Sequence, residues 1–306
     1  MDGSIYPGDA LLMFAFNAVM HNTVRQSFRG TAIFGYGYSN AAVSMTNLVS
    51  NAGVVTTDVT GVGTARYILA AAGYGADKAI FGYGTGVANS SLTNLVSNTG
   101  VVSTDVTGVG TARSYLAAAG YGSDKAIFGY GYASDRVSMT NLVSNTGVVS
   151  TDVTGVGTAR YFLAAAGYGT DKAIFGYGFA LAVSSLTNLV SNTGVVATDV
   201  TGVGTARHQL AAAGYGSDKA IFGYGGASSL TNLVSNTGVV STDVTGVGTA
   251  RSQLAAAGYG VDKAIFGYGA TGSVVSMTNL VSNTGVVSTD VTGVGTARYY
   301  LAAAGL

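Results

Sequence analysis

The side chains best suited to chemistry in this sequence are an Asp and an Arg that recur in a fixed relationship. The Asp of "TDVTG" precedes the Arg of "TGVGTAR" by eight residues, as in Asp105 and Arg113. A ring of such pairs could bind a polyanion or a carboxylate. Because a catalytic residue should differ from its repeated copies and none does, we favour structural roles, with the Asp bonding backbone donors and the Arg bonding carbonyls or the adjacent unit. The acidic members are Asp58, Asp105, Asp152, Asp199, Asp243 and Asp290.

Other reactive groups are too few for a familiar catalytic or metal centre. The chain has no Cys and no Glu, and its two His, His21 and His208, lie in different regions. The Gly-rich segments "GYGTG" and "GVGTA" lack the Lys and Ser/Thr of a phosphate loop. We therefore expect no enzyme activity, no catalytic residues, no metal site and no cofactor.

Composition excludes some partners. Lys and Arg number 14 and acidic residues 14, so no basic excess is present to neutralise nucleic-acid phosphates. Charged residues make up only 9% of the chain, and mean hydropathy is +0.39. The apolar run Ala10 to Met20 is too short to span a bilayer and follows no positive segment. We expect no membrane insertion and no signal peptide.

The elements that position these residues form an internal repeat. "AIFGYG" begins at Ala32, Ala79, Ala126, Ala173, Ala220 and Ala264, so successive copies are 47 residues apart except the last, which is 44. "TNLVSN" and "TGVGTAR" recur with the same period. Six units of this length predict a β-propeller. A sialidase-like propeller enzyme with an Asp-based site is therefore a second alternative.

Each unit contains four short runs that read as strands, and the third unit shows them clearly. They are Ser114 to Tyr121, Lys125 to Tyr130, Val137 to Val143 and Val148 to Thr154, separated by turn residues. The chain ends with the first run of a unit, "YYLAAAGL", and its first unit lacks that run. The sequence therefore predicts an all-β fold, a six-bladed propeller of four-stranded antiparallel blades, closed by the C-terminal strand completing the N-terminal blade.

The order of elements in one unit resembles that of a Kelch repeat. These elements are Arg113, "LAAAG", "KAIFGYG", "TNLVSNTG" and "TGVGTAR". The resemblance covers residues 31–306 and implies a Kelch-like propeller domain. Residues 1–30 have no counterpart in the repeats and form a separate appendage. Asp9 could cap a short amphipathic helix there, with an edge strand "LLMFAF" as the other reading. This appendage could pack on the propeller or dock on a larger assembly, which would make the propeller a structural spacer.

The repeats differ from one another at two places. Two variable residues follow each repeat Arg: Tyr67 and Ile68, Ser114 and Tyr115, Tyr161 and Phe162, His208 and Gln209, Ser252 and Gln253, Tyr299 and Tyr300. A second variable segment follows each "FGYG" and includes Tyr38, Asn40, Tyr132, Asp135, Arg136 and Phe179. In a four-stranded antiparallel blade both segments lie at the same end, because strand direction alternates.

We therefore predict that these residues form a ligand-binding face for a protein or a surface glycan. Aromatic residues supply rigid contact area, and small polar residues adapt to a partner. Drift in tolerant loops is the alternative explanation for the variation. Near-identical units and a low-charge surface resemble phage tail-fibre or other virion-associated recognition proteins, which implies an extracellular or virion-associated setting.

Overall fold

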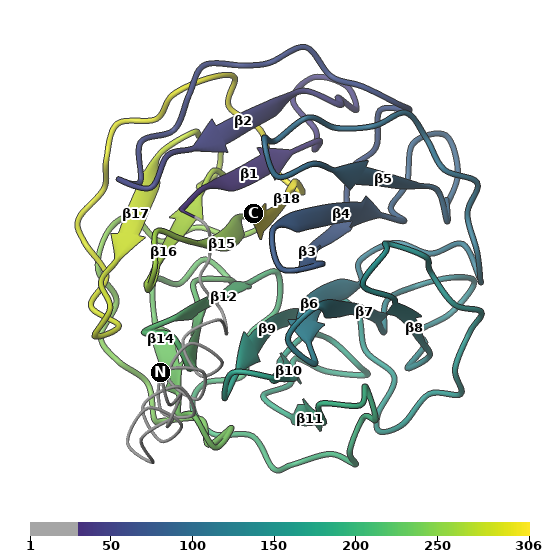
Figure 1. Cartoon of the computed structure of the whole chain (residues 1–306). Coiled ribbons are helices and arrows are strands. Elements are labelled where there is room, and N and C mark those ends of the chain that lie inside the picture. The colour runs from purple at the N-terminus through teal and green to yellow at the C-terminus, as the bar shows by residue number, and fades with distance from the viewer. Residues whose placement is uncertain (1–29) are drawn as a thin grey trace, which may run out of the picture.

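The computed structural model describes residues 30–306 as an all-β structure of six antiparallel three-stranded sheets arranged around one axis (Figure 1). The innermost strands are β3 (Ala70–Tyr74), β6 (Ala117–Tyr121), β9 (Ala164–Tyr168), β12 (Ala211–Tyr215), β15 (Ala255–Tyr259) and β18 (Ala302–Gly305). The middle strands are β1 (Ala32–Gly35), β4 (Lys78–Gly82), β7 (Lys125–Gly129), β10 (Lys172–Gly176), β13 (Lys219–Gly223) and β16 (Lys263–Gly267). The outer strands are β2 (Thr46–Val49), β5 (Thr93–Val96), β8 (Thr140–Val143), β11 (Thr187–Val190), β14 (Thr231–Val234) and β17 (Thr278–Val281).

The two ends of the described chain share one sheet. Strand β18 pairs antiparallel with β1, with Ala32 opposite Gly305, and β1 pairs with β2. Each innermost strand also contacts the innermost strands on both sides, so the contacts run around the whole ring. The prediction that the C-terminal strand completes the N-terminal blade is confirmed. The arrangement is consistent with a six-bladed propeller. We number the sheets as blades 1 (β18, β1, β2) to 6 (β15, β16, β17).

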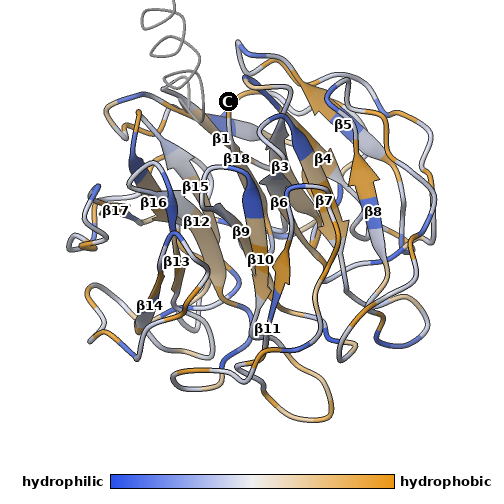
Figure 2. Cartoon of the chain, turned by 60° about the horizontal axis from the view of Figure 1, so that its bottom comes forward, coloured by the Kyte–Doolittle hydropathy of each residue, from blue (hydrophilic) through white to orange (hydrophobic). Residues whose placement is uncertain are grey.

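The hydrophobic core lies between blades rather than within one blade. The core between blades 2 and 3, for example, joins Tyr74 and Ile80 of one sheet to Phe128 and Val143 of the next. Equivalent clusters occupy the other interfaces. Figure 2 shows hydrophobic colour running along the strands, with mixed colours in the connecting loops. A blade cannot bury its apolar faces alone, so the repeats stabilise one another.

The predicted fourth strand of each blade is wrong, and the sheets have three strands. In blade 3 the segment Val148–Thr154 runs beside β8 but forms only two isolated bridges, from Val149 to Val143 and from Val153 to Thr140. The residue numbers of an antiparallel pair should have a constant sum, yet these sum to 292 and 293. One extra residue therefore lies in the outer segment, which is a β-bulge.

Side chains explain why the ladder breaks at this bulge. The Ser150 hydroxyl accepts the Leu142 N–H at 2.9 Å. The buried Asn141 amide donates to the Ser150 carbonyl at 3.0 Å and to the Asp152 carboxylate at 2.9 Å. The "STD" sequence thus satisfies polar groups through side chains where a regular strand would use its backbone, and it brings Asp152 within hydrogen-bond distance of Asn141.

The N-terminal appendage cannot be compared with its prediction, because residues 1–29 lie outside the described part of the chain. Gly30 forms an isolated bridge with Gly260 of blade 6. Within residues 30–306 no helix is long and apolar enough to cross a bilayer.

Candidate functional site

The two variable segments of a blade meet, as the strand directions predict. In blade 2 the N–H groups of Tyr67 and Thr85 each donate to the other's carbonyl at 2.9 Å. Four other blades have the same bridge, namely Tyr38–Tyr299, Ser114–Tyr132, Tyr161–Phe179 and Ser252–Ala270. We call this end of the ring the variable face and the other end, with the hairpins between innermost and middle strands, the constant end. The predicted convergence is confirmed.

The second variable residue of every pair belongs to a closed ring of backbone hydrogen bonds around the axis. Each N–H donates to the carbonyl of the equivalent residue in the preceding blade, over 2.8 to 3.1 Å. All of these residues have positive φ, between 54° and 61°. We call them the axial ring: Ile68, Tyr115, Phe162, Gln209, Gln253 and Tyr300. The left-handed conformation at Tyr115 interrupts the start of the predicted first run, which is why β6 begins at Ala117 rather than Ser114.

Aromatic side chains on the variable face form one connected cluster. The rings of Tyr115 and Phe162 are 4.2 Å apart between centroids, and those of Phe162 and Tyr300 stack at 6.1 Å. We call the cluster the aromatic crescent: Tyr38, Tyr67, Tyr115, Tyr132, Tyr161, Phe162, Phe179, His208, Tyr299 and Tyr300. Tyr132 is 37% exposed, and the other members are half-buried. The sequence predicted variable aromatic residues on this face but not their contact across five blades.

Between the ends of the crescent lies a polar gap on blades 5 and 6. Gln209 donates its amide N–H to the Tyr300 hydroxyl at 2.9 Å. The neighbouring Gln253 carboxamide is half-buried and makes no side-chain hydrogen bond within residues 30–306. The 44-residue unit lacks three residues in its second variable segment, which in blade 5 is reduced to Gly226 and Ala227. The axial ring and the Leu residues beneath it line a small depression of about 80 Å³.

Some of the predicted site residues are buried and others are accessible to a partner. The side chains of Ile68 and Ser114 are 7% and 3% exposed, so they position the loops and offer a partner little contact area. Asn40 is exposed at the rim of the face. Ser252 and Tyr299 are half-buried.

Charge on this face is low and internally compensated. Asp135 and Arg136 are the charged residues of the variable segments, and Arg136 Nε lies 3.6 Å from the Asp135 carboxylate. Arg136 Nη1 also donates to the Ala180 carbonyl of the next blade at 2.7 Å. Burial lowers the pKa of His208 below 6.5, which keeps its imidazole neutral at pH 7. Burial, followed by the nearby Tyr115, raises the pKa of Tyr300 and keeps its phenol protonated.

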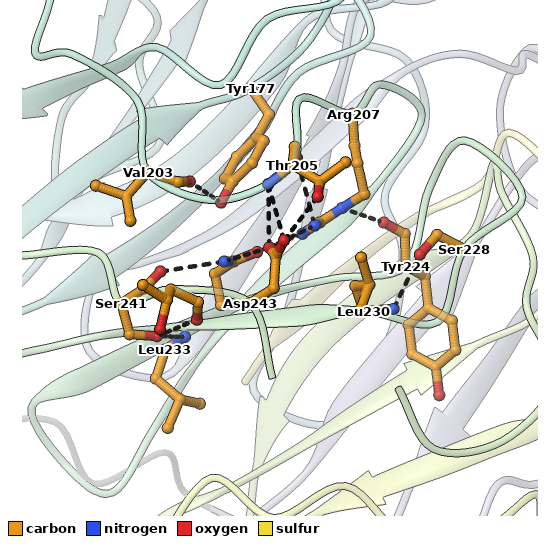
Figure 3. A network of polar contacts seen from close by, with 12 residues as sticks. Tyr177, Val203, Thr205, Arg207, Tyr224, Ser228, Leu230, Leu233, Ser241 and Asp243 are labelled. Carbon is orange, nitrogen blue, oxygen red and sulfur yellow. Dashed lines mark hydrogen bonds and ion pairs between the residues drawn. The ribbon is translucent and has the colours of Figure 1, made fainter. Parts of the chain in front are cut away.

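The recurrent Arg residues lie apart from this surface, in the interior, as Figure 3 shows for Arg207. Arg207 is 2% exposed. Its Nε donates to the Tyr224 carbonyl at 3.0 Å and its Nη2 to the Asn232 Oδ1 at 2.6 Å. The guanidinium also lies over the Tyr177 ring of the preceding blade, 5.0 Å from its centroid. Each such Arg therefore joins two blades, as expected for a structural residue.

The recurrent Asp residues bind the segment that leads into their own blade, and their partners differ from those suggested by the sequence. Asp243 pairs with Arg207 at 3.4 Å, although the Arg that follows it by eight residues is Arg251. It accepts hydrogen bonds from the Thr205 N–H at 3.0 Å and the Thr205 hydroxyl at 2.6 Å (Figure 3). Burial alone would raise the pKa of Asp243, but the hydrogen bonds from Thr205 and Asn232 outweigh it and lower the pKa below 3.8.

The constant end is built from the hairpins between the innermost and middle strands. Its hairpins are linked by backbone bonds such as Gly75 N–H to the Asp124 carbonyl at 2.7 Å. Lys125 and Asp124 form a solvated pair at 3.5 Å. A cavity of about 190 Å³ opens here along the axis, lined mainly by Ala and Gly of the innermost strands. Residues at this end repeat almost unchanged from blade to blade.

The groups gathered on the variable face are phenols, phenyl rings, amides and aliphatic side chains. Within residues 30–306 no cluster of three or more His, Asp or Glu could hold a metal ion. The arrangement can stack flat ligand surfaces and exchange hydrogen bonds with neutral polar groups. No model of a known protein family matches the chain, and no curated protein matches it in sequence.

Proposed function

We propose that the protein is a non-enzymatic binding module whose variable face contacts a protein or glycan partner. The observation that carries this proposal is the assembly of the variable residues of separate repeats into one aromatic crescent around the axis. Constant residues at the same end form the Arg and Asp bonds within and between blades, so the variable positions are those free to contact a partner. Half-exposed Tyr and Phe rings beside adaptable polar groups are typical of recognition surfaces.

The amplified, nearly identical repeats suit a recognition protein whose surface changes quickly while its scaffold stays fixed. We place the module on this ground in an extracellular or virion-associated setting, similar to a tail-fibre receptor-binding component.

A binding screen against immobilised glycans and intact cell surfaces tests the proposal. The test variant changes Tyr161, Phe162, His208 and Tyr300 to Ala, which removes the centre of the crescent. We expect it to lose the binding that the unmodified protein shows. Circular dichroism and thermal unfolding of the variant establish that the ring remains folded.

A matched control alters the same kind of surface at the constant end. Val101, Val148 and Val195 are equivalent residues that are 65 to 66% exposed there, and the control changes all three to Ser. Binding should persist in this control. Equal binding by the crescent variant and the unmodified protein would overturn the proposed function.

A further inference from the structure

We propose that the partner is a neutral carbohydrate, with one sugar ring stacked on the aromatic crescent and its hydroxyl groups bonded in the polar gap. This inference rests on the proposed function and assigns the chemical class of the ligand. It depends on three features of the variable face: its charge, its unpaired amide groups and the shape of its aromatic surface.

Charge complementarity excludes a strongly charged ligand. The single acidic and single basic residue of the variable segments, Asp135 and Arg136, are 3.6 Å apart and neutralise each other. The recurrent Asp carboxylates at the rim are paired with buried Arg residues, as Asp243 is with Arg207 at 3.4 Å. An acidic glycan, a phosphate or a basic peptide would find no counter-charge here.

The polar gap offers groups that match hydroxyls. Gln209 donates one amide N–H to the Tyr300 hydroxyl, and the carboxamide of Gln253 is unused by the described chain. An amide carries both donors and acceptors, and a sugar hydroxyl is both a donor and an acceptor. The depression of about 80 Å³ beside these amides can receive part of a sugar ring. A folded protein partner typically buries about 800 Å² of each surface, far more than this depression offers.

The crescent supplies the second half of the site. Phe162 and Tyr300 lie almost parallel, with an interplanar angle of 17°, and flank the axis near the gap. The apolar C–H face of a pyranose can rest on such rings while its hydroxyls point toward the two Gln residues. A ligand placed in this way contacts blades 1, 4, 5 and 6 together.

The repeats themselves provide test variants that the scaffold accommodates. Tyr161→Ser with Phe162→Gln gives blade 4 the pair found in blade 6 and interrupts the crescent. Ser252→Tyr with Gln253→Phe does the reverse and fills the polar gap with aromatic rings. Because each pair already occupies the equivalent position elsewhere in the ring, both variants should fold.

The probe is an array of neutral oligosaccharides with matched sialylated and sulfated forms. We expect binding to the neutral forms, at least tenfold weaker in either variant and unchanged in the triple Val→Ser control at the constant end. Weaker glycan binding by the gap-filling variant separates carbohydrate recognition from non-specific hydrophobic binding. Added aromatic surface alone would strengthen non-specific binding. Affinity should also change less than about twofold between ~0.05 and ~0.5 M salt.

Two results would overturn the carbohydrate assignment: preference for the charged glycans, or stronger binding by the gap-filling variant. Periodate cleaves the vicinal diols of sugars. Binding to a cell surface before and after periodate treatment therefore tests the carbohydrate assignment separately from the proposed function. Binding that depends on the crescent but survives periodate refutes the carbohydrate and leaves the recognition face standing. Equal binding by the crescent variant and the unmodified protein refutes both the carbohydrate assignment and the proposed function.

Discussion

Replacing a single recurrent arginine should weaken the ring as a whole, and Arg207→Met is the change to make. The side chain joins its own blade to the preceding one through the Tyr224 carbonyl, the Asn232 amide oxygen and the Tyr177 ring. Methionine fills a similar volume and makes none of these polar contacts. The Asn232 oxygen and the Asp243 carboxylate would lose their cationic partner.

Removing one partner of a buried ion pair costs about 3 to 5 kcal/mol. The Asp243 side chain is 26% exposed and keeps its bonds from Thr205, so solvent and hydrogen bonding compensate part of the lost charge. We therefore expect a decrease of about 3 kcal/mol in the free energy of unfolding, at the lower end of that range.

Urea denaturation followed by far-ultraviolet circular dichroism measures this decrease. Arg136→Met is the matched control, because Arg136 is partly solvated, and the loss of its pair with Asp135 and its bond to the Ala180 carbonyl should together cost about 1 kcal/mol. A decrease for Arg207→Met as small as that of the control would refute the argument that these arginines hold the blades together.

Three further predictions concern the same interfaces. Burial would raise the pKa of Asp152, but hydrogen bonds outweigh it and lower this pKa. The contribution of Asp152 to stability is therefore complete above pH 3.8 and is lost as pH falls through the lowered pKa. Urea midpoints measured across that range should show this loss in the unmodified protein and a smaller loss in Asp152→Asn. Tyr83→Phe removes the hydroxyl that donates to the Val109 carbonyl at 3.1 Å and should cost about 1 kcal/mol, measured by the same denaturation; no change would mean that water replaces the bond. Gly129→Ala places a methyl group 2.7 Å from the Phe175 ring of the next blade and should cost about 1 to 3 kcal/mol by thermal unfolding, whereas unchanged stability would show that the blades can separate slightly.

Sequence reasoning predicted the features that follow from the repeat period and strand alternation. The six copies of "AIFGYG" gave the number of sheets, and the incomplete first unit gave the pairing of β18 with β1. Alternating strand direction gave the convergence of Tyr67 and Thr85. These depend on local pattern and chain order, which the sequence contains directly.

Features that depend on side-chain geometry were not predictable in this way. Composition made Val148–Thr154 look like a strand, but the Ser150 hydroxyl and the Asn141 amide take hydrogen bonds that a strand ladder would use. The Asp and Arg of "TDVTG" and "TGVGTAR" were read as neighbours in sequence, whereas the ring pairs Arg207 with Asp243. The left-handed axial ring has no sequence signal, because its members include Ile and Phe, which rarely adopt positive φ.

Amide hydrogen exchange of the protein, free and saturated with a bound partner, tests the central claim most directly. The account predicts added protection in peptides covering residues 114–115, 132–136 and 161–162, whose backbone groups lie on the variable face. Peptides covering the constant-end turns at residues 97–101 and 144–148 should exchange at the same rate in both states. Protection at the constant-end turns without any at the variable face would contradict it.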